Sequence, residues 1–291
     1  DRILENFKIS VTSLNKFLKC RLAFYFENLL RVPMGRNSYL GFGNAIHYAM
    51  EQFFADINRS SPRSYGQVAK LTGFFEKGME KYKSHFTDAE YGDLMKYGSD
   101  TLTQYYDVYS KEWLNVPEYF IEYDIKQTEY NGVPISGKLD RVNIYNGYVT
   151  VTDYKTGTIE KEKTNSYRED KKNQIGGDYW RQIMFYRLLL DGDKRNNWNM
   201  REGIISGMEK DKQSGKFKQA IIPVTAEDLE FVGNQLTEAY REIKNHKFTP
   251  GCGEENCRWC NFVSRNMPPT LPVGTPETEE ADQEPVFEPG I

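Results

Sequence analysis

The chain has 291 residues, a length that suits one large domain or one domain with appendages. It has no apolar run long enough to cross a membrane and no opening secretory signal, so we expect a cytoplasmic protein with no membrane partner. The net charge of −4 argues at first against binding to nucleic acid, but six acidic residues and no Lys or Arg follow Arg265. The rest of the chain is therefore mildly basic, which is compatible with a nucleic-acid partner.

Apolar periodicity and turn signals predict an α/β chain with a mixed central sheet flanked by helices. Residues 1–265 would form one domain with a helical insertion at about 58–116, and the acidic, Pro-rich residues 266–291 would form a disordered tail. The expected helices cover about 10–30, 41–57, two or three pieces of 64–114 that break near 86–88 and 98, 177–191 and 225–246, and the expected strands about 119–129, 133–145, 148–154, 201–208 and 217–223.

The most informative segment is a predicted hairpin around Asn146-Gly147, since Asn-Gly between alternating residues is a strong hairpin signal. If these two residues form the turn, Tyr145 pairs with Tyr148, and the same register places Asp140 opposite Asp153. Side chains alternate between the faces of a strand, so the two aspartates would end an apolar stripe of Val142, Ile144, Val149 and Val151. A second pair, Asn131-Gly132, marks another hairpin.

The two opposed aspartates predict a cation site. Carboxylates that face each other repel, and burying them is costly unless they are paired. A divalent cation between Asp140 and Asp153 would resolve both problems, and Mg²⁺ is usually held by one or two carboxylates together with substrate phosphates. Lys155 lies on the same face, and two aspartates with a lysine suit metal-assisted attack on a phosphodiester. The alternative is a surface ion pair at a frayed strand end.

Other candidate residues lie before and after this hairpin. His47 is on a predicted helix and could bind a metal as neutral imidazole, although a surface histidine paired with Glu51 is the simpler alternative. Gln182 and Tyr186 are four residues apart and share a helix face, from which Gln could bond a base or phosphate and Tyr could stack or donate. An ordinary amphipathic helix explains that pair equally well.

The four cysteines suggest a metal site that links the two ends of the chain. Cys252, Cys257 and Cys260 have the spacing C-x4-C-x2-C, and Cys20 is far away in sequence. Four thiolates suit Zn²⁺ or an iron–sulfur cluster. Two disulfides or four unrelated thiols are the alternatives, but the lack of secretory features and the x2 spacing favour a metal.

Taken together, these motifs resemble the PD-(D/E)XK nuclease superfamily, in particular its RecB-like branch. The matching pieces are Gly43-x3-His47, Gly137-x2-Asp140, Asp153-x-Lys155 and Gln182-x3-Tyr186, which span roughly residues 10–262 in the family's order. Each piece is short, but four in order at suitable spacing are fairly specific. The resemblance implies a restriction-endonuclease-like fold. Cys20 and the C-terminal cysteine triplet are similar to the branch, including AddB, that closes the nuclease with a [4Fe–4S] cluster.

The resemblance also implies roles for individual residues. His47, Asp140, Asp153 and the backbone carbonyl of Tyr154 would bind Mg²⁺ or Mn²⁺. Lys155 would position or activate the attacking water and stabilise the developing negative charge. Gln182 and Tyr186 would contact DNA, and Glu122 in the first strand is a further acidic candidate.

The chain departs from this branch at two positions. Arg21 follows the first cysteine where the family usually has Pro, and Asn266 stands where the last cysteine would fall. Cys252, which lies upstream, either replaces that ligand of an iron–sulfur cluster or belongs to a zinc site.

The sequence therefore predicts a metal-dependent DNA nuclease, an exonuclease domain that belongs to or partners a helicase in recombination and repair. A catalytically inactive DNA-binding or scaffolding module of such a complex is the alternative. A zinc-stapled structural domain would explain the cysteines but would not explain the opposed aspartates Asp140 and Asp153.

Overall fold

The computed structural model describes residues 2–60, 67–157, 159–169 and 173–266, so the predicted tail, apart from Asn266, lies outside the described residues. The strands are β1 (Glu118–Tyr130), β2 (Val133–Tyr145), β3 (Tyr148–Lys155), β4 (Met200–Lys210) and β5 (Phe217–Pro223). The helical elements are α1 (Arg2–Glu5), α2 (Val11–Lys19), α3 (Arg21–Phe24), η1 (Tyr25–Leu29), α4 (Ser38–Arg59), α5 (Val68–Lys81), η2 (Lys83–His85), α6 (Asp88–Leu114), α7 (Lys161–Thr164), α8 (Asp178–Gly192), α9 (Ala226–Lys244) and α10 (Arg258–Asn266).

The strands form one mixed sheet in the order β1-β2-β3-β4-β5. Strands β3 and β4 are parallel, and the other neighbours are antiparallel. Asn131 and Gly132 make the β1–β2 turn with φ of 48° and 76°, and Gly147 in the β2–β3 turn has a φ of 88°. Both Asn-Gly pairs thus form the predicted hairpins. The parallel pair needs a crossover, which α7 and α8 supply.

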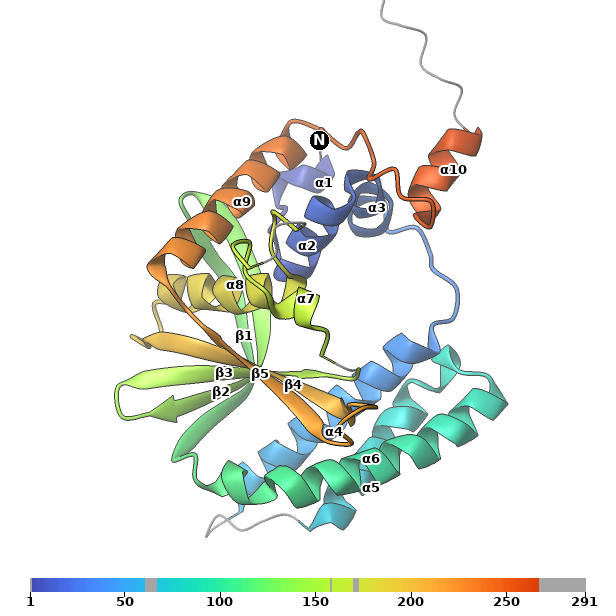
Figure 1. The fold of residues 1–291 in the computed structure, drawn as a ribbon, viewed down its shortest axis with the longest axis vertical. Coiled ribbons are helices and arrows are strands. Elements are labelled where there is room, and N and C mark those ends of the chain that lie inside the picture. The colour runs from blue at the N-terminus through green and yellow to red at the C-terminus, as the bar shows by residue number, and fades with distance from the viewer. Residues whose placement is uncertain (1, 61–66, 158, 170–172, 267–291) are drawn as a thin grey trace, which may run out of the picture.

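Helices cover both faces of the sheet (Figure 1). Helices α2, α8 and α9 pack on one face, where Val142, Val149 and Val151 join their core. Helices α4, α5 and α6 pack on the other, which also buries the Arg141 guanidinium over the rings of Phe54 and Tyr119. The predicted fold class, a mixed sheet flanked by helices, is confirmed.

Two of the predicted helix boundaries are wrong. The helix expected over residues 10–30 breaks at Cys20, whose φ of −158° and ψ of 112° are extended, and a π-helix, η1, follows α3. Gly98 does not interrupt α6; a Cβ there would overlap the rings of Phe75 and Phe42, so the missing side chain allows close helix packing. Among the described helices, none combines the length and the apolar character that a membrane span requires.

Candidate active site

The β2–β3 hairpin has the predicted register. Tyr145 pairs with Tyr148, and the ladder continues to Arg141 opposite Thr152. Asp140 and Asp153 are one step beyond that pair, at the end of the ladder. Asp140 Oδ2 accepts a hydrogen bond of 2.9 Å from the Tyr154 backbone N–H. The hairpin therefore brings the two aspartates to one place, as the Asn146-Gly147 turn requires.

Asp140 lies in a small group of metal-type ligands contributed by three elements. His47 Nδ1, on α4, lies 3.4 Å from Asp140 Oδ2. Glu122, on β1, joins them, and one ligand atom from each of the three residues lies within 4.8 Å of the others. The contact between His47 and Asp140 favours the site interpretation of this histidine over a simple surface pair with Glu51.

Glu122 has a backbone conformation that is rare for a residue other than glycine. Its φ is 49°, in the left-handed region that a non-glycine residue in a strand seldom adopts. It falls between Ile121, which pairs with Arg141, and Tyr123, which pairs with Leu139, and so beside Asp140. Lys138 Nζ makes an ion pair of 2.5 Å with Glu122 Oε2. Strain of this kind costs about 1–3 kcal/mol and clusters at functional sites.

Asp153 is held by three side chains. It is 2% exposed, and its Oδ1 accepts hydrogen bonds from Gln182 Nε2 and from the Tyr186 hydroxyl, both 2.7 Å long. Lys155 Nζ lies 2.7 Å from its Oδ2 as an ion pair. Burial and the charges of Asp153 and Asp140 raise the pKa of Tyr186 well above its usual range, so the phenol keeps the proton that it donates.

Burial and nearby charges shift the pKa values of Asp140 and Lys155. Burial and the charge of Asp153 raise the pKa of Asp140 to about 7, while His47 opposes the shift. Burial lowers the pKa of Lys155, but the charge of Asp153 more than offsets it, so the pKa of Lys155 lies above its ordinary value. The site thus combines a carboxyl that is costly to ionise with a firmly charged ammonium group.

The arrangement of two aspartates and a lysine at the end of a β-hairpin agrees with a comparison over most of the chain. A family model described as the PD-(D/E)XK nuclease superfamily matches residues 8–265. This chain belongs to the PD-(D/E)XK nuclease superfamily. No curated protein sequence matches it significantly.

One solved structure extends this comparison to the fold. A protein from Eubacterium rectale, provisionally named an exonuclease, has a TM-score of 0.56 and 13% identity, with 92% of this chain and 91% of that chain covered. At that identity the likeness shows the fold alone. SSO0001 has a TM-score of 0.29 and 12% identity over 68% of this chain and 85% of that chain.

PD-(D/E)XK nucleases use divalent metal ions, and the residues of this site fit one. Imidazole and carboxylate donors gather at His47, Glu122 and Asp140. In addition, Asp153 Oδ2 is buried and accepts no well-aligned hydrogen bond from the described residues, although Lys155 lies near it. A divalent cation would satisfy this oxygen and remove the repulsion that raises the pKa of Asp140.

A pocket of about 400 Å³ opens beside the metal-type ligands of this nuclease-superfamily chain. His47, Glu122 and Asp140 line it together with the cationic side chains of Lys81 and Lys138. A pocket lined by both carboxylates and ammonium groups suits a phosphodiester whose charge is shared between a cation and lysines.

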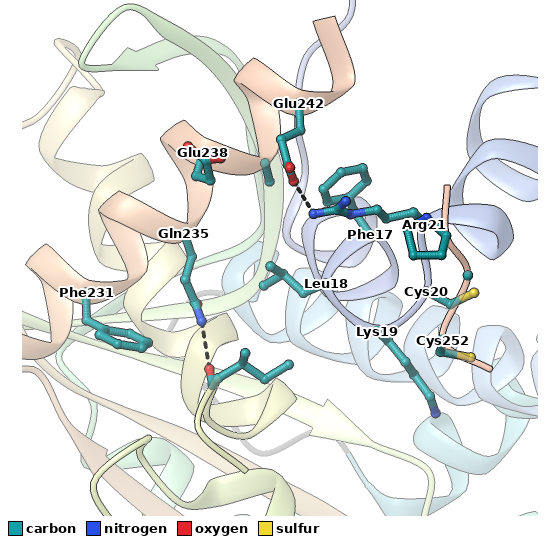
Figure 2. Close-up of a pocket in the computed structure, with 14 residues that line it drawn as sticks. Phe17, Leu18, Lys19, Cys20, Arg21, Phe231, Gln235, Glu238, Glu242 and Cys252 are labelled. Carbon is teal, nitrogen blue, oxygen red and sulfur yellow. Dashed lines mark hydrogen bonds and ion pairs between the residues drawn. The ribbon is translucent and has the colours of Figure 1, made fainter. Parts of the chain in front are cut away.

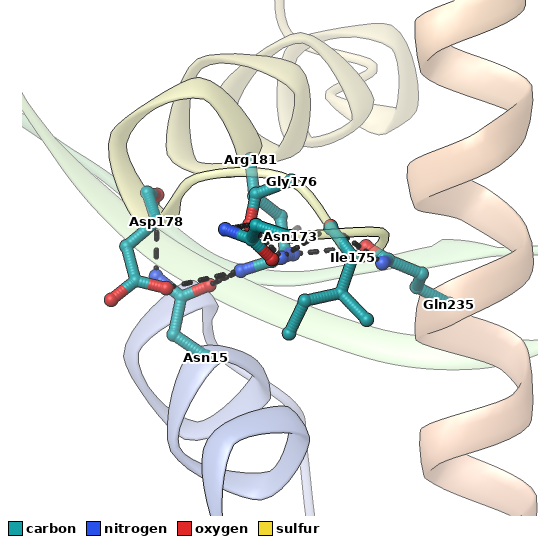
Figure 3. A network of polar contacts seen from close by, with 7 residues as sticks. All are labelled: Asn15, Asn173, Ile175, Gly176, Asp178, Arg181 and Gln235. Carbon is teal, nitrogen blue, oxygen red and sulfur yellow. Dashed lines mark hydrogen bonds and ion pairs between the residues drawn. The ribbon is translucent and has the colours of Figure 1, made fainter. Parts of the chain in front are cut away.

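Helix α8 carries Gln182 and Tyr186, and its position is fixed by a buried arginine (Figure 3). Arg181 is 0% exposed. Its guanidinium donates to Gln235 Oε1 on α9 at 2.9 Å, to Asn15 Oδ1 on α2 at 2.6 Å and to Asp178 Oδ1 at 3.2 Å. It also donates to the carbonyls of Ile175 and Gly176 at 2.6 and 2.9 Å, so every nitrogen of the group has a partner.

The structure therefore brings His47, Asp140, Asp153, Lys155, Gln182 and Tyr186 into one region. The DNA contacts expected of Gln182 and Tyr186 remain a prediction, since in the structure both side chains bind Asp153. From the sequence, Glu122 is only a further acidic candidate, and Arg181 is not predicted to have a role. No sequence signal distinguishes Arg181 from the other arginines, because its role comes from partners on three segments.

Proposed function

We propose that this chain is a metal-dependent deoxyribonuclease that hydrolyses phosphodiester bonds and acts as an exonuclease. The single observation that carries the proposal is that His47, Glu122 and Asp140 gather next to the buried Asp153 and its ion-pair partner Lys155. Fold membership alone would not require this set of donors. The adjoining pocket with Lys81 and Lys138 offers a place for a DNA phosphate.

In this proposal the cation is held by His47, Asp140, Asp153 and the carbonyl of Tyr154, and we add Glu122 to that set because of its place beside Asp140. When bound, Mg²⁺ or Mn²⁺ would supply a Lewis acid for the phosphate and favour ionisation of the attacking water.

The chain's own side chains then orient the reaction. The ammonium of Lys155 positions the water and stabilises charge that develops on the phosphate. Gln182 and Tyr186 hold Asp153 in place, and we keep a contact with DNA as a second role for them.

The finer assignment follows from the resemblance in sequence. We propose a RecB/AddB-like nuclease domain over residues 1–265, with the helical insertion at about 58–116, that works with a helicase domain or subunit in DNA recombination and repair. The resemblance implies a [4Fe–4S] cluster at the four cysteines, with Zn²⁺ as the alternative. The spacing of their sulfurs favours zinc.

The test is cleavage of end-labelled single-stranded and double-stranded DNA by anaerobically purified protein with Mg²⁺ or Mn²⁺. We expect cleavage that needs the cation and that is lost in Asp153→Ala. Progressive shortening from an end would support the exonuclease. DNA binding without cleavage by folded, metal-supplied protein would contradict the proposal and favour the non-catalytic scaffolding module.

A further inference from the structure

The four cysteines come from two distant parts of the chain and meet at one point. Cys20 is the extended residue between α2 and α3, and Cys252 and Cys257 lie in the segment between α9 and α10. Cys260 is in the first turn of α10. All four are free thiols, and their four sulfur atoms lie within 4.8 Å of one another.

The distances between these sulfurs decide which metal centre fits. Cys20 Sγ lies 3.7 Å from Cys257 Sγ and 3.8 Å from Cys260 Sγ, and Cys252 Sγ lies 3.7 Å from Cys260 Sγ. Four thiolates around one tetrahedral Zn²⁺, with Zn–S bonds of about 2.3 Å, lie about 3.8 Å apart. A [4Fe–4S] cluster binds each cysteine to a different iron at a corner of the cluster, so it separates the sulfurs more widely.

We propose that Cys20, Cys252, Cys257 and Cys260 bind one tetrahedral Zn²⁺ ion instead of an iron–sulfur cluster. The sequence agrees with this assignment, because Asn266 occupies the place of the last cluster cysteine and Cys252 supplies the fourth thiolate from a different position. A ligand set that closes around one ion has no open position, which is the mark of a structural zinc site.

Backbone groups around the cysteines support a metal-thiolate centre. The N–H of Ala23 points to Cys20 Sγ at 3.5 Å. The N–H groups of Gly253, Glu254 and Cys260 donate to the sulfurs of Cys260, Cys252 and Cys257, respectively. Donors of this kind orient the ligands and offset the negative charge that four thiolates leave on a divalent ion.

The two segments that carry the cysteines are also packed together. Phe26 on η1 stacks on Trp259 with ring centroids 4.4 Å apart, and Trp259 Nε1 donates to Glu27 Oε1 at 2.7 Å. Figure 2 shows Cys20 and Cys252 side by side at one end of a pocket of about 510 Å³, near the ion pair that joins Arg21 to Glu242 on α9. The zinc ion would lock this contact between the two ends of the domain.

The consequence for the nuclease site is indirect. Asn15 on α2, in the segment just before Cys20, is a partner of the buried Arg181 of α8. Helix α8 in turn holds Asp153 through Gln182 and Tyr186. Zinc at Cys20 thus stabilises the support of the site without touching a reacting atom.

The test is the metal content of the whole protein, purified without oxygen from cells supplied with both iron and zinc. We expect about one zinc per chain, no acid-labile sulfide and no brown absorption. About four irons with sulfide would overturn the proposal, and so would folded protein without metal. Asp153→Ala is the matched control, because it removes the nuclease site and should leave the zinc content unchanged; the two proposals can therefore fail separately.

Because Cys257→Ser could fail to fold, a second measurement uses the wild-type chain. Zinc is released with a thiol-binding mercurial, the mercurial is displaced from the cysteines with excess small-molecule thiol, both are removed without oxygen, and the metal-free protein is titrated with Co²⁺ as the probe. We expect the strong visible absorption of tetrahedral thiolate-bound cobalt to saturate at about one ion per chain, and zinc to displace it. Weak absorption of the octahedral type, or no saturation, would contradict the assignment. Where Cys257→Ser folds, its zinc content should fall at least about tenfold.

Discussion

The Tyr186 hydroxyl donates a hydrogen bond of 2.7 Å to Asp153 Oδ1, the oxygen that also accepts from Gln182. The bond joins α8 to the end of β3, and both side chains are buried. A helix on one face of the sheet therefore fixes the carboxylate that the β2–β3 hairpin brings to the site.

Removing this bond should slow cleavage without removing the metal site. A hydrogen bond to a charged group contributes about 1.5–3 kcal/mol, so we expect Tyr186→Phe to lower kcat about 10- to 100-fold. KM for DNA should change little if the tyrosine acts through Asp153. A large rise in KM with unchanged kcat would instead favour a direct DNA contact. Tyr240→Phe, on α9, is the matched control.

Glu122→Gln tests the strained residue of β1. The amide keeps the shape of the side chain but removes one negative charge from the group with His47 and Asp140. We expect the concentration of Mg²⁺ for half-maximal activity to rise at least about tenfold, because carboxylates are the preferred ligands of this cation. Glu118→Gln, at the start of the same strand, should leave the metal titration unchanged. An unaltered titration for Glu122→Gln would exclude it from the metal site.

Lys155→Met tests the charge beside Asp153. Methionine keeps much of the apolar stem and removes the ammonium that lies 2.7 Å from Asp153 Oδ2. We expect the cleavage rate to fall at least about a hundredfold, because we propose that this charge stabilises the transition state. The folded state should persist, since Gln182 and Tyr186 still bind Asp153, and circular dichroism would check it. Lys161→Met on α7 is the control, and retained activity in Lys155→Met would refute the assigned role.

Arg181→Met should act mainly on stability. The substitution removes the donor to the side-chain oxygens of Asn15 and Gln235. The carbonyls of Ile175 and Gly176 each lose one hydrogen bond but keep a second, from Gln235 and Asn173 respectively. Each unsatisfied buried group costs about 1–3 kcal/mol, so we expect the free energy of unfolding to fall by about 3 kcal/mol or more in urea denaturation. Arg241→Met on α9 removes an exposed pair with Glu238 and should leave the free energy of unfolding nearly unchanged. Equal effects of the two substitutions would contradict the buried network.

Local sequence determined the β2–β3 hairpin that carries Asp140 and Asp153. Asn146-Gly147 sets the turn, the turn sets the register, and the register places Asp140 next to Asp153. The spacing of Gln182 and Tyr186 likewise put both side chains on one face of α8. These features depend on residues that are close in the chain. The turn type and the periodicity of side chains along a strand or helix are therefore enough to predict them.

The place of Glu122 could not be predicted in this way. Counting from the Asn131-Gly132 turn puts Tyr123 opposite Asp140, but the register shifts by one between Ile125 and Thr128, and Glu122 takes that position. A bulge shifts the pairing by one residue, so each side chain beyond it lies on the opposite face from the one expected. The sequence contains no turn signal that predicts this bulge.

The remaining features came from contacts between distant segments. Cys20 lies more than 230 residues from Cys252 in the sequence, and their meeting depends on how α3 packs against the segment before α10. Arg181 gains its role only because α2, α9 and the segment before α8 converge on its guanidinium. Local propensities fix strands, turns and helix faces, whereas the tertiary structure alone decides which distant polar groups satisfy one another in the interior.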